Sequence, residues 1–184
     1  MLTRPGASFP LARSLRDGGV SLGEVMAFLS GLYFRGKHAY ARTFGRPPST
    51  IASGGLIVTS NSGLWPMERQ VTAADLVRLG EGDIDCDDDS YRTPLERDLT
   101  ALAAAPADIV LLGSIASEKY VRPMTAILGE RLLFPPAFIG RGDMSRGGLL
   151  LRCVESGAEL PYAPVIGAPR HGKRPERLPP KPRR

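Results

Sequence analysis

The stretch Asp108-Ile-Val-Leu-Leu-Gly-Ser114 is a short apolar run with branched side chains that ends at Gly-Ser. Such a run is typical of a buried β-strand, and Leu56-Ile-Val-Thr59 has the same character. Residues 131–134 and 149–153 are two further strand candidates. The sequence therefore predicts at least four short strands.

Helical patterns separate these strands. Ser21-Leu-Gly-Glu24 is a capping box, and the apolar residues after it recur at every third or fourth position as far as Phe44. Further helices are expected over residues 72–79, 94–105, where Thr93 is the expected N-cap, and 123–128. Strands that alternate with helices predict an α/β fold: a single domain of three layers with a mostly parallel sheet.

The 184 residues, of which 42% are hydrophobic, suffice for one well-packed domain. We expect a loose N-terminal arm over residues 1–20, the α/β domain over residues 21–169, and a tail over residues 170–184. The tail carries seven Lys or Arg side chains against Glu176, a net charge of +6, so the rest of the chain carries −1 of the total of +5. Because the tail is also rich in proline, we expect it to be extended and disordered.

The two cysteines, Cys86 and Cys153, lie far apart without a Cys-x-x-Cys motif. Neither a zinc site nor a disulfide framework is expected. No apolar run approaches the roughly 20 residues that span a bilayer, and we see no secretory signal. The expected location is the cytoplasm, with no membrane partner.

Ligand-binding residues are expected where parallel strands end, because the carboxyl ends of such strands meet at one edge of a sheet. In the first loop the candidate is Asn61. In the second the candidates are Gly113, Ser114, Ser117 and Lys119, because free backbone N–H groups before a helix can hold an anion. The serines could instead serve only as caps of the turn.

The most unusual segment is Gly140-Arg-Gly-Asp-Met-Ser-Arg-Gly-Gly148. Arg141, Ser145 and Arg146 are candidates to bind a phosphate, and Asp143 is the candidate general base. A flexible connection between two strands would explain the same glycines without a ligand.

Two other clusters contain charged residues. Arg35 and His38 lie on one face of the first helix and could receive phosphates, although a solvated helix surface is the simpler explanation of these residues. Asp85, Asp87, Asp89 and Glu96 match part of a calcium-loop pattern, but Ser90 replaces the required glycine, so no metal site is predicted.

Several motifs together resemble a family of uncharacterised bacterial proteins over about residues 20–172. They are Leu32-Tyr-Phe-Arg-Gly-Lys37, Tyr91-Arg-x-Pro-Leu-Glu-Arg-Asp98, Leu112-Gly-Ser114 with Lys119-Tyr120, and Gly140–Gly148. This resemblance implies no established activity. More distantly, the strand that runs into Ser62-Gly-Leu-x-Pro66 is similar to the α/β domain that accompanies archaeosine-type tRNA-modification enzymes.

These observations predict a protein that binds a phosphate-bearing ligand, either a nucleotide or a nucleic acid, and that could also process it enzymatically. The sequence identifies no cofactor. The other hypothesis is a non-catalytic interaction module whose basic tail contacts RNA, DNA or an acidic partner.

Overall fold

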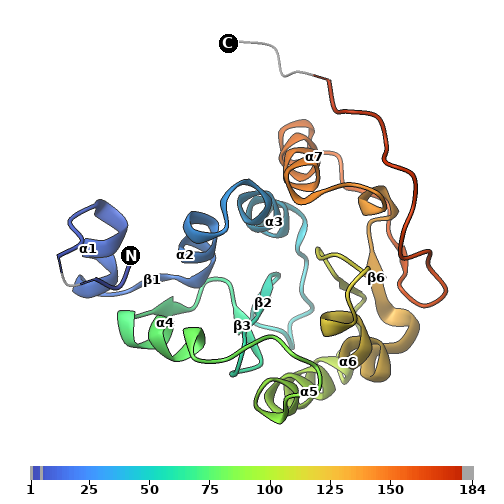
Figure 1. Cartoon of the computed structure of the whole chain (residues 1–184). Coiled ribbons are helices and arrows are strands. Elements are labelled where there is room, and N and C mark those ends of the chain that lie inside the picture. Colours follow the sequence, from blue (N-terminus) through green and yellow to red (C-terminus); the bar gives the residue numbers. More distant parts are fainter. Residues whose placement is uncertain (1, 5, 180–184) are drawn as a thin grey trace.

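A computed structural model describes residues 2–4 and 6–179 of the chain (Figure 1). Its helices are α1 (Pro10–Asp17), α2 (Leu22–Leu29), α3 (Gly31–Phe44), α4 (Ala73–Gly80), α5 (Asp89–Ala103), α6 (Glu118–Leu128) and α7 (Asp143–Ser156), with 3₁₀ turns at Gly129–Arg131 and Pro136–Phe138. Its strands are β1 (Val20–Ser21), β2 (Leu56–Val58), β3 (Leu64–Pro66), β4 (Gln70–Val71), β5 (Ile109–Val110), β6 (Leu132–Phe134) and β7 (Ala163–Pro164). None of the helices in the described ranges is both long enough and apolar enough to span a membrane.

The strands form three small sheets. β1 pairs with β4 and β2 with β3, both antiparallel, while β6 lies between β5, which is parallel to it, and the antiparallel β7. The chain is thus a single mixed α/β body, but the expected single, mostly parallel sheet is wrong. The reason is visible after β2, where both the backbone N–H and the hydroxyl of Thr59 donate to the carbonyl of Gly63. Because Gly63 has a φ of +75°, the chain turns back at once instead of crossing over through a helix.

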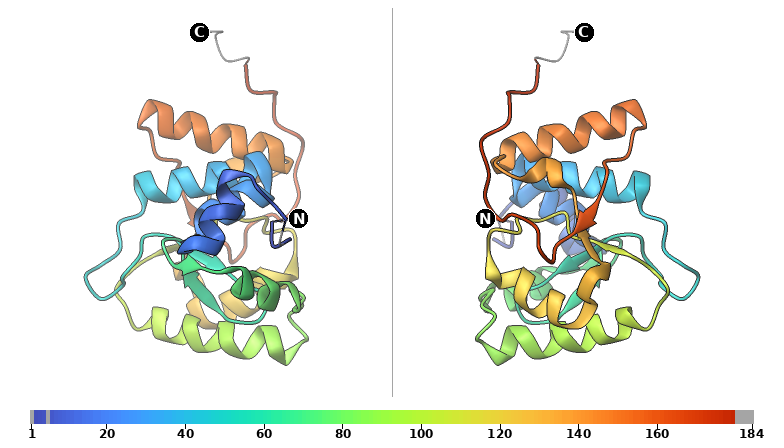
Figure 2. Two further views of the ribbon diagram at one scale, coloured as in Figure 1. Left: turned by 90° about the vertical axis from the view of Figure 1, so that its left-hand side faces the viewer. Right: turned by 90° about the vertical axis from the view of Figure 1, so that its right-hand side faces the viewer.

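Helices lie on both sides of the small sheets, with α3 and α7 on one side and α5 and α6 on the other (Figures 1 and 2). Three groups of buried side chains hold these parts together. One joins α1 and α2 to the first strands, one joins α5 and α6 to β6, and one lies between α3 and α7. The protein therefore has helices on both sides of its strands, as predicted for three layers, but the strands do not form one continuous sheet.

The capping signal at Ser21 and the helix expected from residue 72 both identify helix starts correctly. Ser21 caps α2 by accepting a hydrogen bond from the backbone N–H of Glu24 at 3.3 Å, and Thr72 caps α4 in a reciprocal box with Asp75. The long first helix is wrong in one respect, because it breaks at Ser30 and restarts at Gly31, whose φ is +66°. Its end at Phe44 is confirmed.

Three other elements differ from expectation. Asp88, not Thr93, caps α5, so Pro94 lies inside the helix. Helix α6 starts at Glu118, well before Pro123. Residues 149–153 belong to α7 rather than to a strand: a short apolar run is ambiguous, and here Leu150 and Cys153 are buried one helical turn apart.

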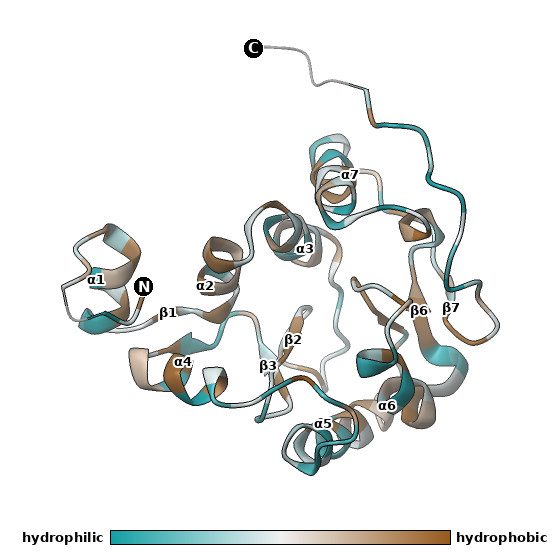
Figure 3. Ribbon diagram, viewed as in Figure 1, coloured by the Kyte–Doolittle hydropathy of each residue, from teal (hydrophilic) through white to brown (hydrophobic). Residues whose placement is uncertain are grey.

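The two ends of the chain contact the body. The N-terminal arm is not loose over α1, because Ala12 and Leu15 are fully buried. Residues 170–179 have no helix or strand and run beside α7 as a hydrophilic, extended segment (Figures 2 and 3). The guanidinium groups of Arg141 and Arg152 donate to the carbonyls of Glu176 and Pro179, respectively. Residues 180–184 lie outside the described residues, and disorder of the tail stays a prediction.

Helices α3 and α7 approach each other through two glycines. A Cβ atom added to Gly36 would lie 2.7 Å from the carbonyl oxygen of Gly147, and one added to Gly147 would lie 2.7 Å from that of Leu32. Both distances are to backbone atoms, which cannot move aside without separating the helices. The contact therefore requires glycine at both positions.

This contact makes a prediction about two adjacent residues. Gly147→Ala should destabilise the protein by about 1–3 kcal/mol, because the methyl group forces the helices apart. Gly148→Ala is the matched control, since its Cβ would meet only the end of Leu178 at 3.5 Å. That variant should gain about 0.5–1 kcal/mol from the better helix propensity of alanine. Urea denaturation of the two variants checks the difference, and equal stabilities would refute the contact.

Candidate functional site

A cavity of about 1030 Å³ lies between α3, the β2–β3 hairpin and the end of β5. Most of its wall is apolar and includes Ile57, Leu64, Leu99, Leu102, Ile109 and Met124. Cavities of this size accept a small organic ligand, and such ligands are usually oriented by a few polar groups among apolar side chains. The polar groups therefore decide what this cavity can bind.

One group of polar residues lies where α3 meets the loop after β5. The hydroxyl of Tyr33 donates to the carbonyl of Leu112 at 3.2 Å, which fixes the helix to this loop. Gly113 and Ser114, the next residues, both line the cavity. Their backbone N–H groups make no hydrogen bond to any residue that the structure describes. Two main-chain donors are thus available beside the cavity.

Lys37 lies one helical turn beyond Tyr33 and also lines the cavity. Its Nζ is 4.1 Å from the centroid of the Tyr33 ring, and no carboxylate in the described ranges lies within 4.0 Å of it. Burial, the main cause, lowers the pKa of Lys37 to about 8. The charge of Asp143 opposes this shift and that of Arg146 adds to it. No close negative charge therefore offsets the cost of burying this ammonium group.

Two tyrosines accompany this lysine. Burial raises the pKa of Tyr33 to about 12, so its hydroxyl remains a hydrogen-bond donor at neutral pH. Tyr120 of α6 lines the cavity as well, and burial also raises its pKa. Both aromatic rings can pack against a flat ligand while their hydroxyl groups stay neutral.

The Gly140–Gly148 segment forms the start of α7 rather than a flexible connection. Asp143 lines the cavity, and its carboxylate pairs with Arg146 at 3.3 Å. Arg146 also donates to the carbonyl of Phe138, at 3.3 Å, and its side chain is only 12% exposed. Arg141 donates to Ala137 and to the hydroxyl of Ser145, at 3.0 and 3.1 Å. Through these hydrogen bonds the two arginines and Ser145 stabilise the turn before α7. None of the three lines the cavity.

The remaining candidates are placed as follows. His38 lines the cavity, and burial, with the charge of Arg42 second, lowers its pKa. Arg35 is exposed and lies outside the lining. Asn61 donates to the carbonyl of Arg78 at the end of α4, also away from the cavity.

Ser117 and Lys119 mark the start of α6. The hydroxyl of Ser117 accepts from the backbone N–H of Lys119 and so caps the helix. The side chain of Lys119 is exposed, and neither residue lines the cavity. Of the predicted residues, Gly113, Ser114, His38 and Asp143 therefore line this cavity.

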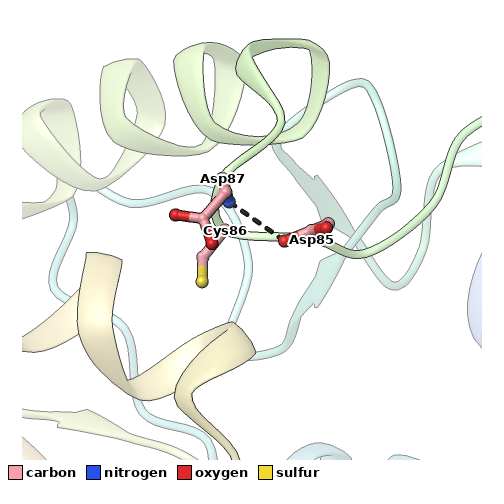
Figure 4. Close-up of side chains that lie close together, drawn as sticks. All are labelled: Asp85, Cys86 and Asp87. Atoms are coloured by element: carbon pink, nitrogen blue, oxygen red, sulfur yellow. Dashed lines mark hydrogen bonds between the residues drawn. The ribbon is translucent and has the colours of Figure 1, made fainter.

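Asp85, Cys86 and Asp87 place one potential metal-ligand atom each within 4.8 Å of one another (Figure 4). Other contacts use the two carboxylates, because Asp85 accepts from the backbone N–H of Asp87 and Asp87 pairs with Arg122. The remaining acids of the calcium-like pattern, Asp89 and Glu96, both pair with Arg92. Their carboxylates face arginines rather than one shared centre.

Comparisons with models of protein families, with curated proteins and with solved structures found no match to this chain. The site must therefore be argued from its own geometry. Sequence analysis passed over Tyr33, Lys37 and Tyr120 as site residues. Their signal was weak: the spacing of four places Tyr33 and Lys37 on one helix face, but nothing local shows that this face borders a cavity.

The buried ammonium of Lys37 makes a prediction about stability and pH. Below pH 8 the lysine is charged in both folded and unfolded states, so the folded state bears the full cost of burying it. Above pH 10.5 the group becomes neutral in both states and the cost disappears. Lys37→Met should therefore be more stable than the original protein at pH 7, by up to about 3 kcal/mol, and this advantage should shrink between pH 8 and 10.

Urea denaturation at several pH values measures this difference. The exposed Lys119→Met is the control and should change stability by less than about 0.5 kcal/mol. An effect of Lys37→Met that does not vary with pH would show that the lysine is not buried as described.

Proposed function

We propose that the protein binds a small phosphate-bearing ligand with an apolar or aromatic body, such as a nucleotide, in the central cavity. The observation that carries the proposal is the polar group at Tyr33, Lys37 and Gly113–Ser114. Two unpaired main-chain donors and a cation without a close carboxylate lie beside one cavity. An anionic group satisfies both at once, because it accepts hydrogen bonds and neutralises the charge.

The rest of the cavity supports the same class of ligand. Its aliphatic wall and the rings of Tyr33 and Tyr120 offer packing surface for a flat or apolar body. The Arg141 and Arg146 side chains, in contrast, donate hydrogen bonds to backbone carbonyls of the protein itself. The phosphate is therefore assigned to the Gly113–Ser114 loop. Whether a reaction follows depends on the residues that face the bound ligand.

The assignment predicts the effect of a charge placed in the loop. Ser114→Asp adds a carboxylate where the phosphate is expected, and two like charges about 4 Å apart repel by on the order of 4 kcal/mol at an effective dielectric constant of 20. We expect nucleotide binding to weaken at least about tenfold. Aspartate can still accept the hydrogen bond that Ser114 takes from the N–H of Ala116, so the turn should remain.

Ser117→Asp is the matched control, because aspartate is as good an N-cap as serine and Ser117 lies outside the lining. The measurement is thermal stabilisation of the full chain by nucleoside phosphates, compared with the same nucleosides without phosphate. No stabilisation by any phosphate, or equal loss in both variants, would contradict the assignment.

A second candidate function is an interaction module that binds nucleic acid through the C-terminal segment. The observation in its favour is that, apart from Arg170, which pairs with Glu118, the basic side chains of this segment are not needed to hold it on the body. Gly140 packs against the carbonyl of Lys173, and Arg141 donates to that of Glu176. The side chains of Lys173, Arg174 and Arg177 are meanwhile exposed. A polyanion could therefore contact them without displacing the segment.

This candidate predicts a change in salt dependence. Replacing Lys173, Arg174 and Arg177 by Gln removes three charges but keeps the backbone contacts. For a single-stranded oligonucleotide, the slope of log K against log salt should fall in magnitude by about 2. The control replaces the exposed Arg4, Arg13 and Arg16, near α1 and away from the tail (Figure 1). Equal slopes in both variants would assign the binding to total charge alone.

A further inference from the structure

Lys37 combines the features that make an amine reactive. It lies in a mostly apolar cavity, pairs with no close carboxylate among the described residues, and has the cation of Arg146 as a neighbour on α7. Desolvation and a nearby positive charge are the two ways in which proteins activate a lysine as a nucleophile. A lysine that served only to attract an anion would need neither desolvation nor a nearby positive charge.

We propose that Lys37 forms an imine with a carbonyl group of the ligand that occupies the cavity. This inference rests on the proposed function, because the ligand that reacts is the one that the cavity binds. The ligand class is thereby narrowed to phosphate-bearing aldehydes or ketones. The phosphate lies at Gly113–Ser114 and the carbonyl carbon faces the Nζ atom of Lys37.

The step balances without an oxidant or a reductant. The lone pair of the neutral amine attacks the carbonyl carbon, so that a C–N bond forms while the C=O π electrons move to oxygen. A proton passes from nitrogen to oxygen to give a carbinolamine. Loss of one water molecule, formed from that hydroxyl and a second proton, gives the imine. Asp143, which lines the same cavity and whose charge acts on Lys37, is the carboxylate to which the proposal assigns these proton transfers.

The neutral amine is accessible near physiological pH. Before a ligand binds, a pKa of about 8 leaves roughly a tenth of Lys37 neutral at pH 7, against well under a thousandth of an ordinary lysine. The groups that act on the amine are Tyr33 and Phe34 of its own helix and Asp143 and Arg146 of α7. Burial is the largest effect on the pKa of this amine, ahead of the opposing charges of Asp143 and Arg146, so the apolar surroundings decide its state.

The chain makes this testable because it contains only four lysines, at positions 37, 119, 173 and 181. The full-length protein is treated at pH 7 with pyridoxal 5′-phosphate, an aromatic aldehyde that carries a phosphate, and the imine is reduced with borohydride. Peptide mass spectrometry then assigns the label and separates it from the N-terminal amine. We expect at least tenfold more label on Lys37 than on Lys119. Labelling of Lys37 no faster than Lys119 would overturn the proposal.

Two comparisons keep this result distinct from the proposed function. Pyridoxal has the aldehyde without the phosphate, so preference for the phosphorylated probe, lost in Ser114→Asp but not in Ser117→Asp, reports the phosphate subsite. Equal labelling of Lys37 by both aldehydes would support the imine and contradict that subsite. Lys37→Arg keeps a positive charge but cannot form an imine, so it should still be stabilised by nucleoside phosphates while the label is lost.

Discussion

The close approach of Gly36 and Gly147 is the contact on which the site depends. Because the two helix backbones touch there, the residues on either side of Gly36 are held beside the first turns of α7. Lys37 follows Gly36 directly, and Asp143 lies about one turn before Gly147. A side chain at either glycine would separate the lysine from the carboxylate and the arginine that act on it. The glycines therefore define the electrostatic environment of the cavity.

A second contact fixes α3 to the sheet. The hydroxyl of Tyr33 donates to the carbonyl of Leu112, immediately before the Gly113–Ser114 loop. The sequence predicted that Ser114 and Asp143 would lie near each other, because the carboxyl ends of parallel strands converge. They do line one cavity, but for another reason, since only β5 and β6 are parallel. Convergence here comes from α3, which contacts both the loop and α7.

What the sequence predicted correctly is local. Ser21 caps a helix through a hydrogen bond to a residue three positions away, so the signal lies within one short segment. The hairpin at Gly63, although its turn is local, also has a distant partner, since Asp98 of α5 accepts from the backbone N–H of Leu64, at 2.8 Å. Arg141 and Arg146 look like ligand-binding residues in sequence, and only the folded chain shows the carbonyls that they contact. Long-range partners therefore account for most of the differences.

Lys37 illustrates the same limit most clearly. A lysine in an amphipathic helix is normally solvated, and nothing within a few residues shows that this one borders a cavity. Its burial costs stability, as do the unpaired N–H groups of Gly113 and Ser114. An apolar side chain filling the cavity would relieve neither cost, because one group needs a negative charge and the other needs acceptors. A single anionic group meets both needs, which is the physical reason to regard these residues as one site.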